Sequence, residues 1–314
     1  MGVSPFTFQL ATRIEFGEGY LTRAGAEAKK LGITKAMVIA DKGIIACGIV
    51  KPIEESLKAE HVDYVIYDQI VPNPRDVHCI AGAEFAKEHQ VDGMIAIGGG
   101  SSMDTAKAVG TLLANGGNIR TWAAPALLEN PIIPLIAVPT TAGTGSEVTF
   151  DAVITDTEAH EKLNILDLKI APKVANVLQG LPEKVMASTG VDALIHALEA
   201  YTCKAASPVT DAFALYAIDL IGANIREAVY QRTKDSCAAM MLGSTMAGVA
   251  FGYSDVAAIH CIAEALGGRY DTPHGVSNAM VLTTVTEFNI PSNMKKYAEV
   301  ARHLGVGYHW HDHR

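Results

Sequence analysis

Short runs of branched apolar residues alternate with longer helical patterns through the first half of the chain. The runs have the length and composition of buried strands, and the segments between them have the apolar spacing of helices. This pattern predicts strands at residues 36–40, 62–67, 93–100 and 134–141. Strands that alternate with helices are typical of a parallel sheet covered by helices, so we predict an α/β domain.

The strand pattern ends near Leu181, and only helical spacing follows it. Long helical patterns occupy residues 183–202, 207–230 and 235–253. Gly180, Leu181 and Pro182 end one pattern and begin the other, so we place a domain boundary there. The prediction is an α/β domain at residues 1–180 and an all-helical domain at residues 181–314.

Length and charge narrow the class of partner. With 314 residues the chain exceeds the usual size of a single core, which agrees with two domains. Its net charge is −9 and its basic residues form no cluster, which argues against nucleic acid or an anionic membrane as partner. The longest weakly polar stretch, 238–253, is shorter than a membrane span. We therefore expect a small-molecule substrate.

The N-terminal residues lack the basic start and apolar stretch of a signal peptide. The five cysteines form no C-x-x-C pair, which is typical of reduced thiols. We expect a cytoplasmic protein, and a homo-oligomer.

The stretch AIGGGSSMDTAK follows the third predicted strand and opens a helix at about Ser102. Backbone N–H groups and the helix dipole at such a turn can hold a pyrophosphate. The stretch is not the G-x-G-x-x-G fingerprint, and three glycines also suit a tight strand-to-helix turn.

A second loop, VPTTAGTGSEVT at 138–149, follows the fourth predicted strand and offers several hydroxyl donors beside its glycines. Two such loops at adjacent strand ends make a cofactor crevice. Asp41 ends the first predicted strand, where a carboxylate can accept a hydrogen bond from a ribose 2′-OH and repel a 2′-phosphate. This reading favours NAD over NADP, and the alternative is that Asp41 caps a helix or a turn.

Asp192 and His196 are spaced i, i+4 in GVDALIHALEAY, so on a helix they project from one face. With His260 and His274 they would give one carboxylate and three imidazoles, a set suited to Fe(II), Zn(II), Co(II) or Mn(II) with a position open to substrate. Each histidine alone would more often be structural, but the combination favours a metal site. Glu264 stands one helical turn after His260, so its carboxylate is predicted to point toward the metal cleft, unless it is a solvated helix residue.

Four stretches, GGGSSMDTAK, PTTAGTGSEVT, GVDALIHALEAY and HCIAEALGGRYDTPHG, occur in this order. Together they resemble the iron-containing (group III) alcohol dehydrogenase family, over about residues 6–305. The resemblance implies a dinucleotide-binding α/β domain followed by a helical metal domain, with the active site in the cleft between them. It implies hydride transfer between NAD(H) and a small alcohol or aldehyde.

By the same resemblance, the metal ligands are Asp192, His196, His260 and His274. The cofactor-binding residues are Gly99, Gly100, Ser101, Asp104, Thr140, Thr141 and Thr144, with Asn73 and Lys162 as further cofactor positions. We predict His274 and Glu264 as catalytic residues, Glu264 from its place one helical turn after His260 and not from the resemblance.

The chain departs from the family pattern in four places. Asp151 stands where relatives often carry Asn, and Glu264 stands where many have another His. Glu264 is therefore expected either to handle the proton or to hydrogen-bond a metal-bound water. The segment 173–184 is shorter than usual, and family members continue through several more helices, so the helical domain is expected to be incomplete. The alternatives are a polyol dehydrogenase or maleylacetate reductase relative, or an inactive truncated protein that binds nucleotide.

Overall fold

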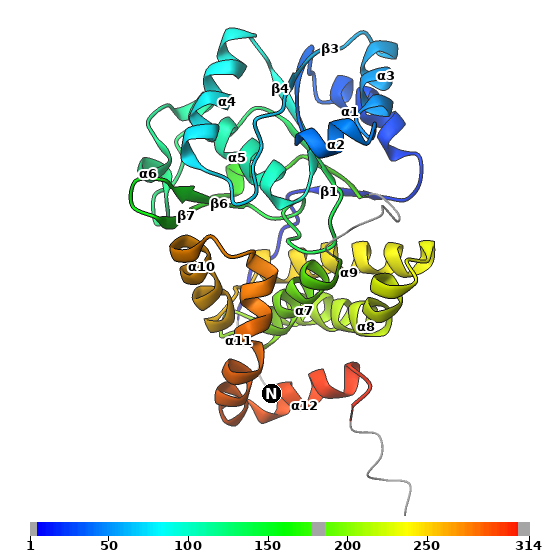
Figure 1. The fold of residues 1–314 in the computed structure, drawn as a ribbon, viewed down its shortest axis with the longest axis vertical. Coiled ribbons are helices and arrows are strands. Elements are labelled where there is room, and N and C mark those ends of the chain that lie inside the picture. The colour runs from blue at the N-terminus through cyan, green and yellow to red at the C-terminus, as the bar shows by residue number, and fades with distance from the viewer. Residues whose placement is uncertain (1–4, 178–185, 307–314) are drawn as a thin grey trace, which may run out of the picture.

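The structure, a computed structural model, describes residues 5–177 and 186–306 (Figure 1). An α/β half lies above a helical half. The strands of the first half are β1 (Arg13–Phe16), β2 (Lys35–Ile39), β3 (Asp63–Tyr67), β4 (Gly93–Gly98), β5 (Leu135–Pro139), β6 (Asp151–Asp156), β7 (Glu161–Leu166) and β8 (Val174–Val177). Its helices are η1 (Tyr20–Arg23), α1 (Ala24–Lys30), α2 (Lys42–Ala46), α3 (Lys51–Ala59), α4 (Asp76–Glu88), α5 (Gly100–Asn115), α6 (Ile119–Trp122) and η2 (Leu168–Ile170).

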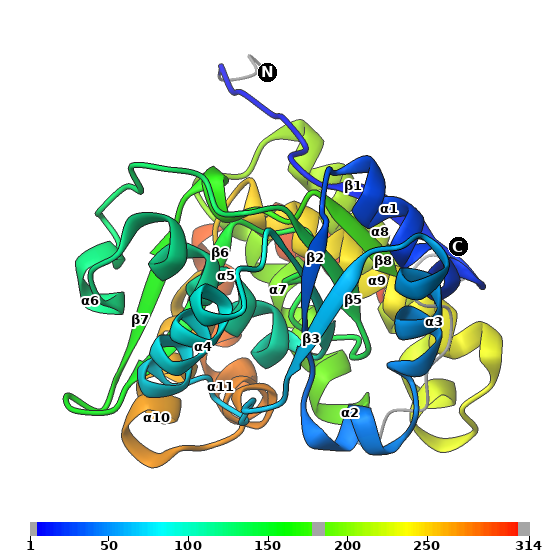
Figure 2. The same ribbon diagram turned by 90° about the horizontal axis from the view of Figure 1, so that it is seen from above.

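A six-stranded sheet in the order β1-β8-β5-β4-β2-β3 forms the centre of this half, and each neighbouring pair is parallel. Side chains of β2 alternate between its faces: Ala36 and Val38 pack with α1 and α3, whereas Met37 and Ile39 pack with α4 and α5. Figure 2 shows these helix pairs on opposite sides of the sheet. The predicted parallel α/β fold is confirmed, and each of the four predicted strands corresponds to one of β2, β3, β4 and β5.

The strand order reverses between β2 and β4, because β3 follows β2 toward one edge while β5 and β8 follow β4 toward the other. Ligands of doubly wound sheets bind at the carboxyl ends of strands at such a point. Asp41 follows β2 there, and Gly99 follows β4. Helix α5 begins at Gly100, earlier than the predicted Ser102, because Gly99 already serves as its N-cap.

The helical half contains α7 (Met186–Thr202), α8 (Pro208–Tyr230), α9 (Lys234–Gly252), α10 (Ala258–Tyr270), α11 (His274–Asn289), η3 (Ile290–Ser292) and α12 (Met294–His303). Its core is built largely from small and branched side chains of α7, α8 and α9. Every described element after residue 186 is helical, as predicted, whereas the predicted boundary at residue 180 lies outside the described residues. Within the described ranges, each helix is too short or too polar to cross a membrane.

The loop at residues 140–146 joins the two halves by close backbone contact. A Cβ atom added to Gly143 would lie 2.8 Å from Cβ of Thr189 on α7. One added to Gly248 on α9 would lie 2.8 Å from both Cα and the carbonyl oxygen of Gly145, which itself has a φ of +61°. Glycine at these positions therefore lets the loop lie directly on α7 and α9.

Replacing Gly248 by Ala is expected to destabilise the protein by about 1–3 kcal/mol, because the new methyl group meets backbone atoms that cannot rotate away. Thermal or urea unfolding measures the change. Gly222→Ala on α8 is the matched control, since its Cβ would come close only to the flexible end of Leu304, at 2.9 Å, and would lie at an ordinary contact distance of 3.9 Å from Leu304 Cα. Equal unfolding curves for the two variants would contradict the close packing of loop and helix.

Candidate metal and cofactor site

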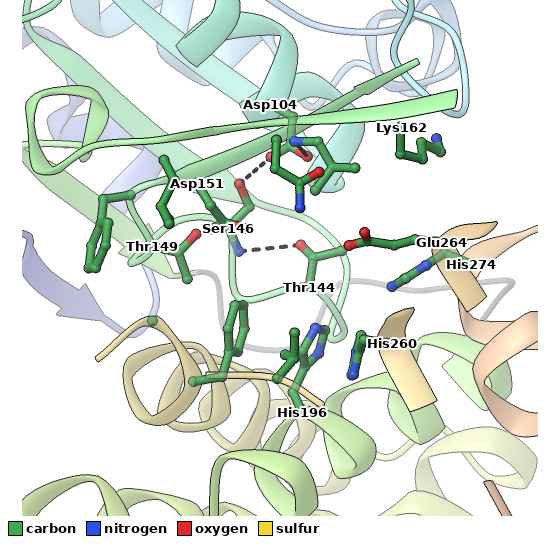
Figure 3. A pocket seen from close by; sticks show the side chains of 18 of the residues that line it. Asp104, Thr144, Ser146, Thr149, Asp151, Lys162, His196, His260, Glu264 and His274 are labelled. Carbon is green, nitrogen blue, oxygen red and sulfur yellow. Dashed lines mark hydrogen bonds between the residues drawn. The ribbon is translucent and has the colours of Figure 1, made fainter. Parts of the chain in front are cut away.

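A cavity of about 410 Å³ lies between the α/β half and the helical half (Figure 3). Its wall includes many of the residues that the sequence singled out: Asn73, Gly100, Ser101, Asp104, Thr144, Lys162, His196, His260, Glu264 and His274. Five other predicted site residues do not line the cavity: Asp41, Gly99, Thr140, Thr141 and Asp192. The structure thus brings both glycine-rich loops and three of the histidines to one cavity.

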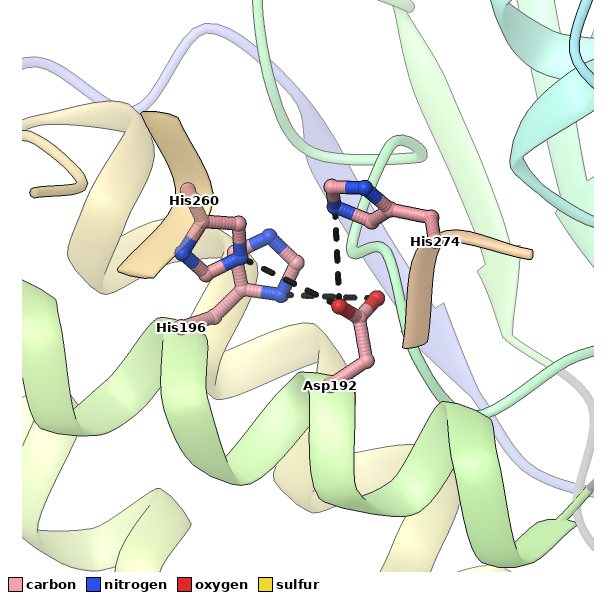
Figure 4. Close-up of side chains that lie close together, drawn as sticks. All are labelled: Asp192, His196, His260 and His274. Atoms are coloured by element: carbon pink, nitrogen blue, oxygen red, sulfur yellow. Dashed lines mark ion pairs between the residues drawn. The ribbon is translucent and has the colours of Figure 1, made fainter. Parts of the chain in front are cut away.

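Three helices carry the predicted metal ligands (Figure 4). Asp192 and His196 lie one turn apart on α7, His260 is on α10, and His274 is the first residue of α11. One ligand atom from each of the four lies within 4.8 Å of all the others. The Asp192 carboxylate is 3.9 Å from His196 Nδ1, 3.9 Å from His260 Nε2 and 3.6 Å from His274 Nε2.

The chemistry of this cluster fits a divalent metal. His196 Nδ1 and His260 Nε2 are buried without a hydrogen-bond partner, which is costly unless a ligand completes them. Burial and the neighbouring His260 lower the pKa of His196 to about 3, so its ring is the neutral form that binds metals. Burial alone would raise the pKa of Asp192, but the three histidines outweigh it and hold the carboxylate ionised.

Two further side chains hydrogen-bond to the predicted ligands, and our sequence reasoning missed both. Glu199 Oε2 lies 2.6 Å from His260 Nδ1, and Asn278 donates from Nδ2 to Asp192 Oδ1 at 2.6 Å. The sequence spacing of each residue from a predicted ligand could have revealed it. Glu199 is i+3 from His196, and Asn278 is i+4 from His274, so each shares a helix face with a ligand.

The two glycine-rich loops lie against each other. Thr141 lies beside Gly99 and Thr144 beside Gly100, where an added Cβ would come within 3.1 Å and 2.7 Å of them, respectively. The Thr140 amide donates to the Gly98 carbonyl at 2.8 Å. This packing leaves Gly100 and Ser101, at the start of α5, on the cavity wall.

Asp41 is the N-cap of α2. Its Oδ1 atom accepts hydrogen bonds from the Gly43 and Ile44 amides at 2.8 and 3.0 Å, which is the capping alternative. Its Oδ2 atom faces Gly98, 3.8 Å from where a Cβ would stand. One oxygen is thus used by the cap, and the other lies beside the first glycine-rich loop.

A buried network fixes the back of the cavity. Lys107 has no solvent exposure, and its Nζ donates to Ser146 Oγ, Thr149 Oγ1 and the Asp151 carbonyl at 2.8, 3.2 and 2.8 Å. Ser146 in turn donates to Asp104 Oδ1 at 2.7 Å. Burial raises the pKa of Asp104 to about 6, although Lys107 opposes this shift.

Residues 11–177 match the iron-containing alcohol dehydrogenase family, and residues 186–313 match the C-terminal family of the Fe-containing alcohol dehydrogenases. The chain belongs to the iron-containing alcohol dehydrogenases. Enzymes of this family use NAD and iron, and this chain is accordingly an oxidoreductase acting on a small alcohol or aldehyde.

Named relatives agree with this assignment. The NAD-dependent methanol dehydrogenase of Bacillus methanolicus is 37% identical over 294 residues, which are 92% of this chain and 77% of that protein. The 1,3-propanediol dehydrogenase of Citrobacter freundii is 38% identical, with 92% and 77% covered. A crystal structure of 1,3-propanediol oxidoreductase superposes with a TM-score of 0.92 at 36% identity, covering 97% of this chain and 81% of that one.

Within this alcohol dehydrogenase, Asn73 and Lys162 bridge the mouth of the cavity. Lys162 Nζ donates to Thr155 Oγ1 at 2.8 Å and to Asn73 Oδ1 at 3.3 Å. Asn73 Nδ2 donates across the cleft to Oδ1 of Asp271, the C-cap of α10, at 2.7 Å. Both predicted cofactor residues thus sit where the two halves meet.

Glu264 lies on α10, one turn after His260, and its side chain points into the cavity (Figure 3). Burial raises the pKa of its carboxyl, although His274 and His260 oppose the shift and Asn164 hydrogen-bonds to it. The predicted orientation toward the cleft agrees with this geometry, whereas its role in proton transfer stays a prediction.

Removing the Glu199 carboxylate is expected to weaken metal binding roughly 10–100-fold, because His260 loses the partner that orients its ring. Competition with a chromogenic chelator measures the affinity of Glu199→Ala. Glu287→Ala, at an exposed position on α11, is the control. Unchanged affinity in Glu199→Ala would show that Glu199 does not support the site.

Proposed function

We propose that this alcohol dehydrogenase interconverts small primary alcohols and aldehydes with NAD(H), and that Asp192, His196, His260 and His274 hold the metal. The observation that carries the proposal is the cluster of four ligand atoms within 4.8 Å, two of them buried nitrogens without partners, beside a cavity that also reaches Gly100 and Thr144. Iron(II) is the metal of the family, and Zn(II), Co(II) or Mn(II) would suit the same donors.

A divalent metal bound there supplies an electrophile that polarises the substrate oxygen. The protein's own residues position that metal and move the proton. Asp192 supplies the one negative ligand, and Asn278 and Glu199 fix the orientation of their partners. Glu264, which faces the cavity one turn after His260, takes up the alcohol proton.

The cofactor is proposed to lie over the start of α5. Free N–H groups at Gly100 and Ser101 suit a pyrophosphate, with Asp104, Thr140, Thr141, Thr144 and Gly99 shaping the turn around it. Asn73 and Lys162 reach its far end. The Asp41 oxygen not used in capping would accept from the ribose, which favours NAD over NADP.

In this proposal residues 1–180 bind the cofactor and residues 181–314 supply the metal site. Association into a homo-oligomer is supported by large apolar side chains exposed on α11 and its neighbours, among them Met280 at 70% and Phe288 at 84%. A cytoplasmic location is supported by the five free cysteines, which suit a reducing compartment.

His274→Ala tests the function. It is expected to abolish NADH oxidation with short aldehydes and to remove the metal, because three ligands hold a divalent ion more weakly. NADH binding should remain measurable by fluorescence, since the glycine-rich loops lie in the other half. Metal analysis of anaerobically purified protein decides the question, and full metal occupancy in the variant would overturn the ligand assignment.

Glu264→Gln keeps the shape of the side chain and removes its charge. Turnover is expected to fall roughly 100-fold with the metal still bound, because the proton acceptor is lost. Stopped-flow hydride transfer together with metal analysis measures both. Wild-type turnover would make Glu264 a bystander, and loss of metal would make it a ligand, so either outcome contradicts the proton role.

A further inference from the structure

Carboxylates dominate the charged part of the cavity wall. Among the described residues that line it, the acidic ones are Asp104, Asp151, Asp255 and Glu264, and Lys162 is the one lysine or arginine. These residues come from separate elements of both halves, so the acidic character belongs to the cavity and not to one helix face.

Two of these charges are already engaged within the protein. Asp104 accepts hydrogen bonds from Ser146 and from the Val153 amide, with Lys107 close behind. Lys162 donates to Asn73 and Thr155. Asp255 accepts a hydrogen bond from the Val256 amide and Glu264 one from Asn164, but neither these two carboxylates nor Asp151 forms an ion pair among the described residues, so their charges are left to act on a substrate.

These three carboxylates line the same cavity as His196, His260 and His274. Asp151 begins β6, Asp255 precedes α10, and Glu264 lies within α10. Phe150, Phe251 and Val256 line the same cavity and offer apolar surface to a short carbon chain. Asp255 is exposed, whereas Asp151 and Glu264 are partly buried. Carboxylates that line one cavity repel an anionic substrate and attract a cationic one, and partial burial strengthens the effect.

We propose that the cavity selects its alcohol substrates by charge, preferring a primary alcohol that carries an ammonium group to one that carries a carboxylate, with Asp151 and Asp255 as specificity-determining residues. This inference rests on the proposed function. Hydroxy acids and other anionic alcohols are accordingly expected to be poor substrates.

A matched series of three alcohols tests the inference: 3-amino-1-propanol, 1-butanol and 3-hydroxypropanoate. They share a short primary alcohol chain and differ at the far end, which is cationic, neutral or anionic at pH 7.5. The iron-loaded enzyme is assayed for NAD reduction with a trap for the aldehyde, and kcat/KM is normalised to the value for 1-butanol. The amino alcohol is expected to exceed the hydroxy acid by at least about tenfold.

The ratio of kcat/KM for 3-amino-1-propanol to kcat/KM for 3-hydroxypropanoate is expected to fall in Asp151→Asn and in Asp255→Asn. The double variant is expected to lower this ratio about tenfold. Asp63→Asn, which removes an exposed charge on β3, is the control and should leave the ratio as it is. A ratio at or below one in the unmodified enzyme, or a ratio that the double variant does not change, overturns the inference. Absence of turnover with all three alcohols instead contradicts the proposed function.

Discussion

The contact of loop 140–146 with helices α7 and α9 is the constraint on which the site depends. Gly143 lies against Thr189, and Gly145 lies against Gly248, at separations that leave no room for a side chain. The His196 ring also hydrogen-bonds to the backbone of Gly143. The loop beside the proposed cofactor crevice is therefore in direct contact with α7, which carries the proposed metal ligands Asp192 and His196, so the loop and the helix are held in a fixed relation.

The sheet could be predicted where strands are buried on both faces. The segments around Val38, Ile66, Ile95 and Ile136 are continuous apolar runs, and each proved to be a strand. Strands β1 and β8 were missed, because RIEF and VANV are short and interrupted by polar residues. The β6–β7 hairpin was missed as well, since polar residues begin and end the β6 sequence DAVITD and interrupt the β7 sequence EKLNIL, so neither is a continuous apolar run.

Side-chain spacing along the sequence predicted the metal cluster in more detail than it predicted the cofactor crevice. An i, i+4 pair such as Asp192 and His196 reports a shared helix face directly, and the same rule would have found Glu199 and Asn278. The capping role of Asp41 was only one of two readings, because a carboxylate after a strand suits both a helix cap and a ribose. The buried position of Lys107 was not predicted, since lysine is rarely buried and the residues next to it in the sequence give no sign of its three distant acceptors.

Lys107 also links distant parts of the chain during folding. Its three acceptors come from residues 146–151, which are synthesised well after α5. An ammonium group taken out of water before those acceptors arrive would be strongly unfavourable. The buried position of Lys107 on α5 is therefore stabilised only together with the segment that follows strand β5. The native packing of α5 thus depends on a segment that follows it in the chain.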